Sequence, residues 1–124
     1  MKVPLLQLLY DLPSFKPIKI QDGDITDEDG RVRPDMVELT VGKVLVGFLS
    51  RPKDGKDTHE ARLARYRIAH AIATVMRSAP SPDEGMFEAD TKDAAVLLDI
   101  VQTHASVVLI GQLLPLVDGK VAKG

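Results

Sequence analysis

The sequence predicts a mainly α protein of the α+β class, a small bundle of about four helices with a short N-terminal β-hairpin. Apolar residues recur at helical spacing from residue 39 onward, whereas an earlier stretch alternates apolar and polar residues beside two Asp-Gly pairs. The core must be aliphatic, because aromatic residues make up only 4% of the chain and tryptophan is absent. A length of 124 residues fits one domain.

The N-terminal part, residues 1–38, is expected to begin with a short helix. Val3–Leu9 is apolar and carries Pro4 at a position where the first turn of a helix accepts proline. Pro13 and Pro17 would end this helix.

A β-hairpin is expected to follow this helix. Ile18–Gln21 alternates apolar and polar residues and ends at Asp22-Gly23, while Arg31–Val37 follows a second Asp-Gly pair. Each strand would be about five residues long, and a hairpin of that size is marginal unless it packs on another element. The acidic stretch 22–29 does not fit a calcium loop, because Gly30 falls one position late when the count begins at Asp24. We therefore interpret it as a solvated turn, and its role stays open.

The helical core is expected over residues 39–118, with a short C-terminal tail at 119–124. Asp57, followed three residues later by Glu60, resembles a capping box and opens the clearest helix of the chain. That helix carries two apolar stripes, which together give one wide apolar face. The stripes are Leu63, Tyr66, His70 and Ala73, and Ala64, Ile68, Ile72 and Val75. The expected helices run from the N-cap Thr40 to Ser50, from Thr58 to Arg77, from Asp90 or Thr91 to a break near Thr103, and from the N-cap Ser106 to Leu114, before Pro115.

No residue pattern indicates catalysis, a cofactor or a metal. The chain has no cysteine, and Leu63 stands where a zinc-binding helix would need a second histidine four residues after His59. His70 and His104 are likewise unmatched in spacing, and the sequence contains neither a Gly-x-Ser-x-Gly elbow nor a P-loop. We expect a protein that is not an enzyme, with no catalytic, cofactor-binding or metal-ligating residues.

A cytoplasmic location is expected, without membrane contact. The most apolar window, Ala94–Val117, contains Asp99 and His104 near its middle, which a membrane-spanning helix would hold only at high cost. Val3–Leu9 is short and lacks the small-residue cleavage site of a secretory signal.

Charge is distributed unevenly along the chain although the net charge is only −2. Seven acidic residues lie between Gln21 and Glu38, and seven basic residues lie between Arg51 and Arg77. A basic helix start could contact a phosphate backbone, which makes a small nucleic-acid-binding or regulatory protein the alternative function. The overall acidity of the chain argues against it. The residues concerned are Arg51, Lys53, Lys56, Arg62 and Arg65.

The last expected helix is apolar on every side, and such a helix must be covered. Two interpretations remain open: burial at the centre of the bundle, or a surface for a protein partner or a second copy of the chain. The residues of this partner surface would be Val107, Ile110, Leu113 and Leu114.

Several short segments resemble small proteins encoded in tailed-phage and prophage genomes. The resemblance lies in a Leu-Thr-x-Gly helix start, an Arg-Tyr-x-x-Ala helix and a closing pair of helices, and it departs at the proline-rich loop 78–86. It implies a phage protein of the bacterial host cytoplasm that acts by protein–protein interaction, in virion or tail assembly, and brings no catalytic residue. The matching residues are Leu39, Thr40 and Gly42; Arg65, Tyr66 and Ala69; and Leu97, Val101, Ile110, Gly111 and Gln112.

Overall fold

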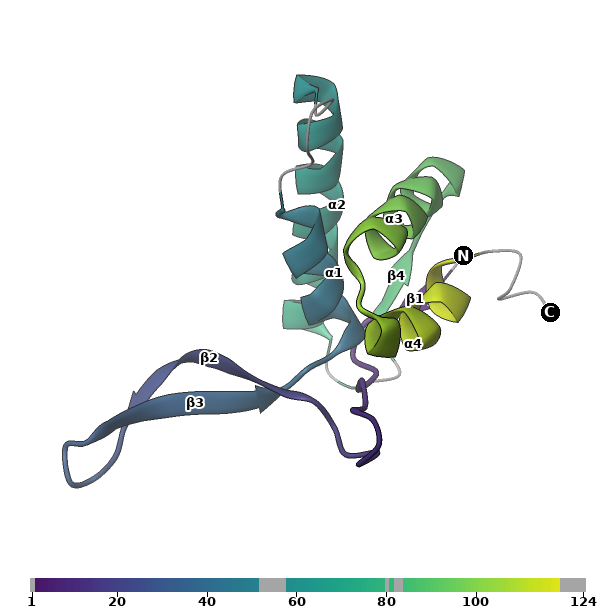
Figure 1. Ribbon diagram of the computed structural model, residues 1–124. Helices are drawn as coiled ribbons and strands as arrows, with labels where there is room; N and C mark the ends of the chain where they lie inside the picture. The colour runs from purple at the N-terminus through teal and green to yellow at the C-terminus, as the bar shows by residue number, and fades with distance from the viewer. Residues whose placement is uncertain (1, 52–57, 80, 82–83, 119–124) are drawn as a thin grey trace.

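The computed structural model describes residues 2–51, 58–79, 81 and 84–118. It confirms the α+β class: four helices and two small antiparallel sheets lie in the described part of the chain (Figure 1). The elements are β1 (Lys2–Pro4), β2 (Lys19–Thr26), β3 (Val32–Glu38), α1 (Val41–Leu49), α2 (His59–Ser78), β4 (Met86–Glu88), α3 (Thr91–His104) and α4 (Val107–Val117). We call α1–α4 with β1 and β4 the helical body, and residues 19–38 the arm.

The core of the helical body is built around α1, which packs against both α2 and α3. Aliphatic side chains fill it, as the composition predicts, and Phe48 and Phe87 are its aromatic members. Helix α4 lies against α3 and against β1, so it closes the body on the side away from α2. Side chains with less than 2% exposure are Val3, Leu5, Leu9, Val41, Leu45, Ile72, Leu97, Ile100, Val101, Leu113 and Val117.

The N-terminal segment is not a helix, so that prediction is wrong. Lys2–Pro4 forms β1 and pairs with β4. The segment then supplies the hydrogen bonds that the start of α1 needs: the Gln7 carbonyl accepts from Val41 N–H at 3.0 Å and the Leu5 carbonyl from Gly42 N–H at 2.8 Å. The first N–H groups of a helix have no partner within it. The extended segment satisfies two of them, which a local helix could not do.

The hairpin exists, but its strands are longer than expected and its turn lies elsewhere. Strands β2 and β3 have 8 and 7 residues, and the chain reverses between Thr26 and Val32. Asp22-Gly23 does not close the hairpin, because the pairing shifts between Gln21 and Asp24 and the pair forms a bulge within β2. Gly23 has a φ of +75°, which suits this irregularity.

Side-chain caps set the starts of the helices. Thr40 and Ser106 cap α1 and α4 as predicted, and Asp90 caps α3, whose start was expected at Asp90 or Thr91. The cap of α2 is Thr58 rather than Asp57: the Thr58 hydroxyl accepts from Ala61 N–H at 3.1 Å. Asp57 itself lies outside the described residues, as do Lys53, Lys56 and the tail 119–124. The predicted end of the last helix before Pro115 is wrong, because α4 continues to Val117; in the last turn a proline removes only one backbone donor.

Candidate interaction site

The arm extends away from the helical body and meets it only at the arm's base (Figure 1). At the base, Ile18 and Ile20 are partly buried against the core. Beyond that point, most side chains of β2 and β3 are exposed on both faces of the ribbon. The ribbon therefore presents side chains and open strand edges to solvent along most of its length.

One face of the arm carries three apolar side chains of β3, which we call the apolar row. Val32, Pro34 and Met36 occupy alternate positions and so lie on the same side of the ribbon. Val32 is 67% exposed and Met36 is 53% exposed. Single exposed apolar side chains are ordinary, whereas a contiguous group is a candidate contact surface. Their cross-strand neighbours on β2 are Thr26, Asp24 and Gln21.

The tip of the arm is a tight turn organised by Asp27. Its Oδ1 accepts from the backbone N–H groups of Asp29 at 3.1 Å and Arg31 at 2.9 Å, and its carbonyl accepts from Gly30 N–H at 3.0 Å. Gly30 has a φ of +80°, a conformation that favours glycine. Glu28 and Asp29 are exposed at this tip. The turn therefore presents two carboxylates to the outside.

At the other end of α1, three arginines gather around a hollow of about 360 Å³, which we call the arginine hollow. Arg51 follows α1, while Arg62 and Arg65 belong to α2. The Arg51 guanidinium lies 5.2 Å from the centre of the Phe48 ring, which orients it. Arg65 is only 6% exposed. Three of the five basic residues singled out from the sequence are thus brought together, and the other two lie outside the described residues.

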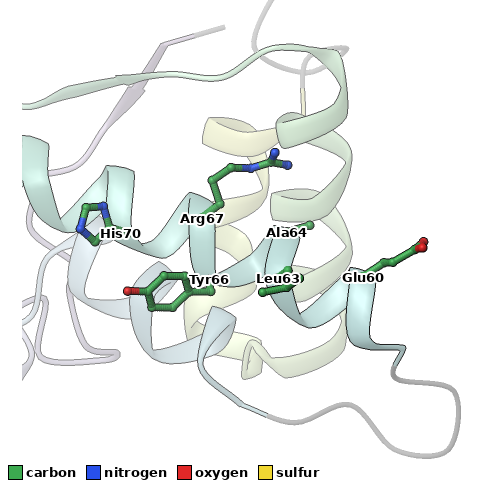
Figure 2. Close-up of a pocket in the computed structure, with 6 residues that line it drawn as sticks. All are labelled: Glu60, Leu63, Ala64, Tyr66, Arg67 and His70. Atoms are coloured by element: carbon green, nitrogen blue, oxygen red, sulfur yellow. The ribbon is translucent and has the colours of Figure 1, made fainter.

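The outer side of α2 continues this surface with exposed apolar side chains. Leu63 is 54% and Tyr66 is 68% exposed, and the Tyr66 ring lies 6.1 Å from that of His70. Only part of the wide apolar face expected on this helix is buried, because α2 buries the side that carries Ile68 and Ile72. Figure 2 shows the described residues that line a depression on this helix, with Leu63 next to Tyr66. Tyr66 lines both this depression and the arginine hollow.

The structure separates the four residues of the partner surface that the sequence suggested on α4. Leu113 is fully buried and belongs to the core, whereas Val107 is 89% exposed. Ile110 and Leu114 are partly buried against the core. Because one side of α4 packs on α3 and β1, these residues do not form one exposed face.

Groups suited to metal binding are absent from the described part of the chain, where no three histidine, aspartate or glutamate side chains lie close enough together to hold an ion. The rings of His70 and His104 lie near aromatic rings instead, those of Tyr66 and Phe48. Among the residues that the structure describes, no helix is both long and apolar enough to cross a membrane.

Sequence reasoning missed the apolar row and the exposed side of α2. The alternation of Val32, Pro34 and Met36 was a usable signal, because apolar residues two apart share one face of a strand. On α2, the spacing of Leu63 and Tyr66 is the same as that of a core stripe. Only the packing of α1 against the opposite side reveals that they stay exposed.

Fold and site together describe a small α+β protein with a helical body and a projecting, acidic β-ribbon arm. Comparison with known proteins adds no relative: no family model, no curated protein and no solved structure matches the chain.

Proposed function

We propose that the chain is a non-enzymatic protein-interaction module of the tailed-phage type, which acts in virion or tail assembly in the cytoplasm of a bacterial host. Its contact element is the arm. The observation that supports this proposal is the apolar row of Val32, Pro34 and Met36, exposed on a ribbon that extends from the body. Because Leu113 is core, the arm takes the place of α4 as the main contact surface.

The physical argument concerns the stability of the arm. A two-stranded ribbon is marginally stable in water on its own. Burial of one valine or methionine side chain against a partner contributes about 1.5–3 kcal/mol. The open edges of β2 and β3 also offer backbone groups for strand addition. A partner that covers the apolar row would therefore order and stabilise the arm.

The test is a double variant on the arm, Val32→Asp with Met36→Asp. The helical body should fold unchanged, because neither side chain belongs to the core. Partners are sought among the proteins encoded by neighbouring genes, by co-expression and affinity capture, and self-association is measured by light scattering. Val107→Asp is the matched control, since it places a carboxylate on an exposed apolar position outside the arm. The proposal fails when the arm variant keeps every association that the control keeps.

A second candidate function is nucleic-acid binding, and the meeting of Arg51, Arg62 and Arg65 around one hollow favours it. Its test is fluorescence anisotropy of a duplex oligonucleotide over a range of salt concentrations. Contacts to phosphates give an affinity that falls steeply with salt. The variant Arg51→Glu with Arg62→Glu should then weaken binding and flatten that dependence.

A further inference from the structure

We infer that the arginine hollow receives the acidic arm tip of a second copy of this chain, so that copies associate head to tail. This inference rests on the proposed function, because it names the partner of the arm. Three observations support it. The tip and the hollow have opposite charges, apolar side chains lie beside both, and the two surfaces lie far apart within one molecule.

The charges of the two surfaces are opposite. The arm holds seven acidic residues against Lys19, Arg31 and Arg33, and the tip places Glu28 and Asp29 outward. The hollow presents two exposed arginines, Arg51 and Arg62, while Arg65 also lines it but is buried and already has an interaction within the chain. Guanidinium groups form paired, charge-assisted hydrogen bonds with carboxylates, which gives both strength and orientation. A turn with two adjacent carboxylates is a suitable occupant for this hollow.

Apolar side chains lie beside the charges on both surfaces. Next to the tip, the arm carries the apolar row, which begins at Val32. Next to the hollow, Leu63 and Tyr66 are exposed on α2. An arm laid along α2 with its tip in the hollow would cover both groups together. Removal of apolar surface from water would then add to the attraction between charges.

The two surfaces of one molecule lie at opposite ends of α1. The arm joins the body at the N-terminal end of α1, just before Val41, whereas the hollow lies at its C-terminal end, around Leu49 and Arg51. A nine-residue helix is about 13 Å long. The arm points away from this helix by a further strand length of roughly 25 Å. The tip of one chain therefore meets the hollow of another chain, not its own.

A contact between two different surfaces of identical chains is heterologous. Repetition of such a contact gives a closed ring when the rotation between neighbours closes, and an open filament when it does not. The contact would also be steered by charge, so it should weaken as salt screens the two surfaces. Both consequences can be measured without knowledge of any other partner.

A nucleic acid is a less suitable occupant of the same hollow. The acidic arm and the net charge of −2 repel a phosphate backbone at long range. The hollow is also lined by Leu49, Ala69 and the Tyr66 ring. This apolar lining suits a protein segment that brings apolar side chains of its own.

The test exchanges the charges of the two surfaces. One variant reverses the tip, Glu28→Lys with Asp29→Lys, and a second reverses the hollow, Arg51→Glu with Arg62→Glu. Arg65 is left in place because its side chain is buried. A third variant carries all four changes in one chain. The control Arg77→Glu with Lys92→Glu makes the same change in net charge as the hollow variant, at exposed positions outside both surfaces. Circular dichroism verifies the fold of each variant.

The native chain should associate at about 100 μM in low salt, a concentration at which contacts with a Kd of about 10 μM form. Its mass in light scattering should fall toward that of one chain in about 0.5 M NaCl. Each half-reversed variant should bind itself at least about tenfold more weakly, because like charges then face each other. The control, the four-change variant and an equal mixture of the two half-reversed variants should all associate.

A native chain that is strictly monomeric under these conditions overturns the inference. So does a four-change variant that stays monomeric, or a monomeric chain that binds the duplex oligonucleotide through Arg51 and Arg62. None of these results removes the proposed function, which fails only when arm variants leave every protein association unchanged.

Discussion

The helical body and the arm place their apolar side chains in opposite ways. In the body, side chains such as Leu45 and Leu97 are fully buried and pack against several elements. In the arm, Val32 and Met36 are more than half exposed, and Ile20 at the base is partly buried against the core. The body is therefore stable by its own packing, whereas the arm depends on its cross-strand hydrogen bonds and on whatever covers it. We therefore expect the body to determine the stability of the fold and the arm to provide contacts, so that substitutions in one region leave the other unchanged.

The first prediction concerns an apolar residue of α4 that is replaced by aspartate. The change should unfold the body at a core position and should be tolerated at an exposed position of the same helix. Leu113→Asp would bury a carboxylate among aliphatic side chains, and we expect a loss of about 4 kcal/mol or more in the free energy of unfolding. Val107→Asp changes a side chain that is 89% exposed, so stability should change by less than about 0.5 kcal/mol. Urea denaturation of both variants tests this. Equal stability of the two would show that α4 is not packed as described.

Two glycines of α1 should respond to alanine with opposite signs. At Gly42 a Cβ would collide with Met76 Sδ and lie 3.1 Å from the Leu5 carbonyl oxygen. We expect Gly42→Ala to lower stability by about 1–3 kcal/mol. At Gly47 a Cβ would have no neighbour within 4 Å among the described residues. Gly47→Ala should therefore raise stability by up to about 1 kcal/mol, because alanine favours the helix. The melting temperatures of both variants test this prediction. If both substitutions raised or both lowered the melting temperature, the described packing of α1 would be contradicted.

A side-chain clamp joins α4 to the N-terminal segment. The Gln112 side-chain amide accepts from Tyr10 N–H and donates to the Tyr10 carbonyl, each at 2.8 Å. Gln112→Ala removes both hydrogen bonds, and we expect a loss of about 1–2 kcal/mol. The measurement is the denaturant midpoint at unchanged slope. Gln102→Ala is the control, since Gln102 is exposed on α3.

The cap of α2 should have a slightly smaller effect. Thr58→Ala removes the hydroxyl that accepts from Ala61 N–H, and loss of such a cap typically lowers stability by about 1 kcal/mol. Thr58→Ser keeps an acceptor and should retain most of the native stability. Two variants with the same midpoint would mean that the helix is capped by another residue.

The sequence predicted the helix starts well, because a capping side chain accepts a hydrogen bond from a backbone N–H only three residues further along the chain. Each of the three helices α1, α3 and α4 begins after a capping residue that is followed by apolar residues at helical spacing. These caps are Thr40, Asp90 and Ser106. At Asp57 and Thr58 two adjacent residues can both cap, and the sequence does not choose between them. Three of the basic residues noted in the sequence, Arg51, Arg62 and Arg65, line one hollow, but that hollow depends on how α1 packs against α2, which the sequence does not give.

The remaining differences come from contacts between distant segments. The N-terminal stretch has an apolar pattern that suits either a short helix or a strand, and its hydrogen bonds to Gly85 and Leu39 decide for the extended form. In the hairpin, Asp-Gly is a turn signal that a bulge can use equally well. On α4, Leu113 and Val107 have similar hydrophobicity in sequence but opposite burial, because α3 and β1 cover one side only.

The smallest change in stability is expected for a substitution in the arm. The arm and the body should nevertheless differ strongly in local opening. Met36→Ser alters a side chain that is 53% exposed and outside the core, so the free energy of unfolding should change by less than about 0.5 kcal/mol. Amide hydrogen exchange should distinguish the regions in the native chain. Amides of the arm can exchange by local opening, whereas those of α1 and α3 need opening of the body.

We therefore expect protection in the arm to be at least about a hundredfold lower than in α1, since opening the ribbon exposes no core. When arms dock on neighbouring copies, exchange in residues 19–38 should slow as the chain is concentrated from about 1 to about 100 μM, because docking stabilises the closed ribbon by mass action. Exchange in α1 should stay constant over the same range. Protection of the arm equal to that of α1 at high dilution would contradict the contrast, because it would mean that the ribbon opens only with the body.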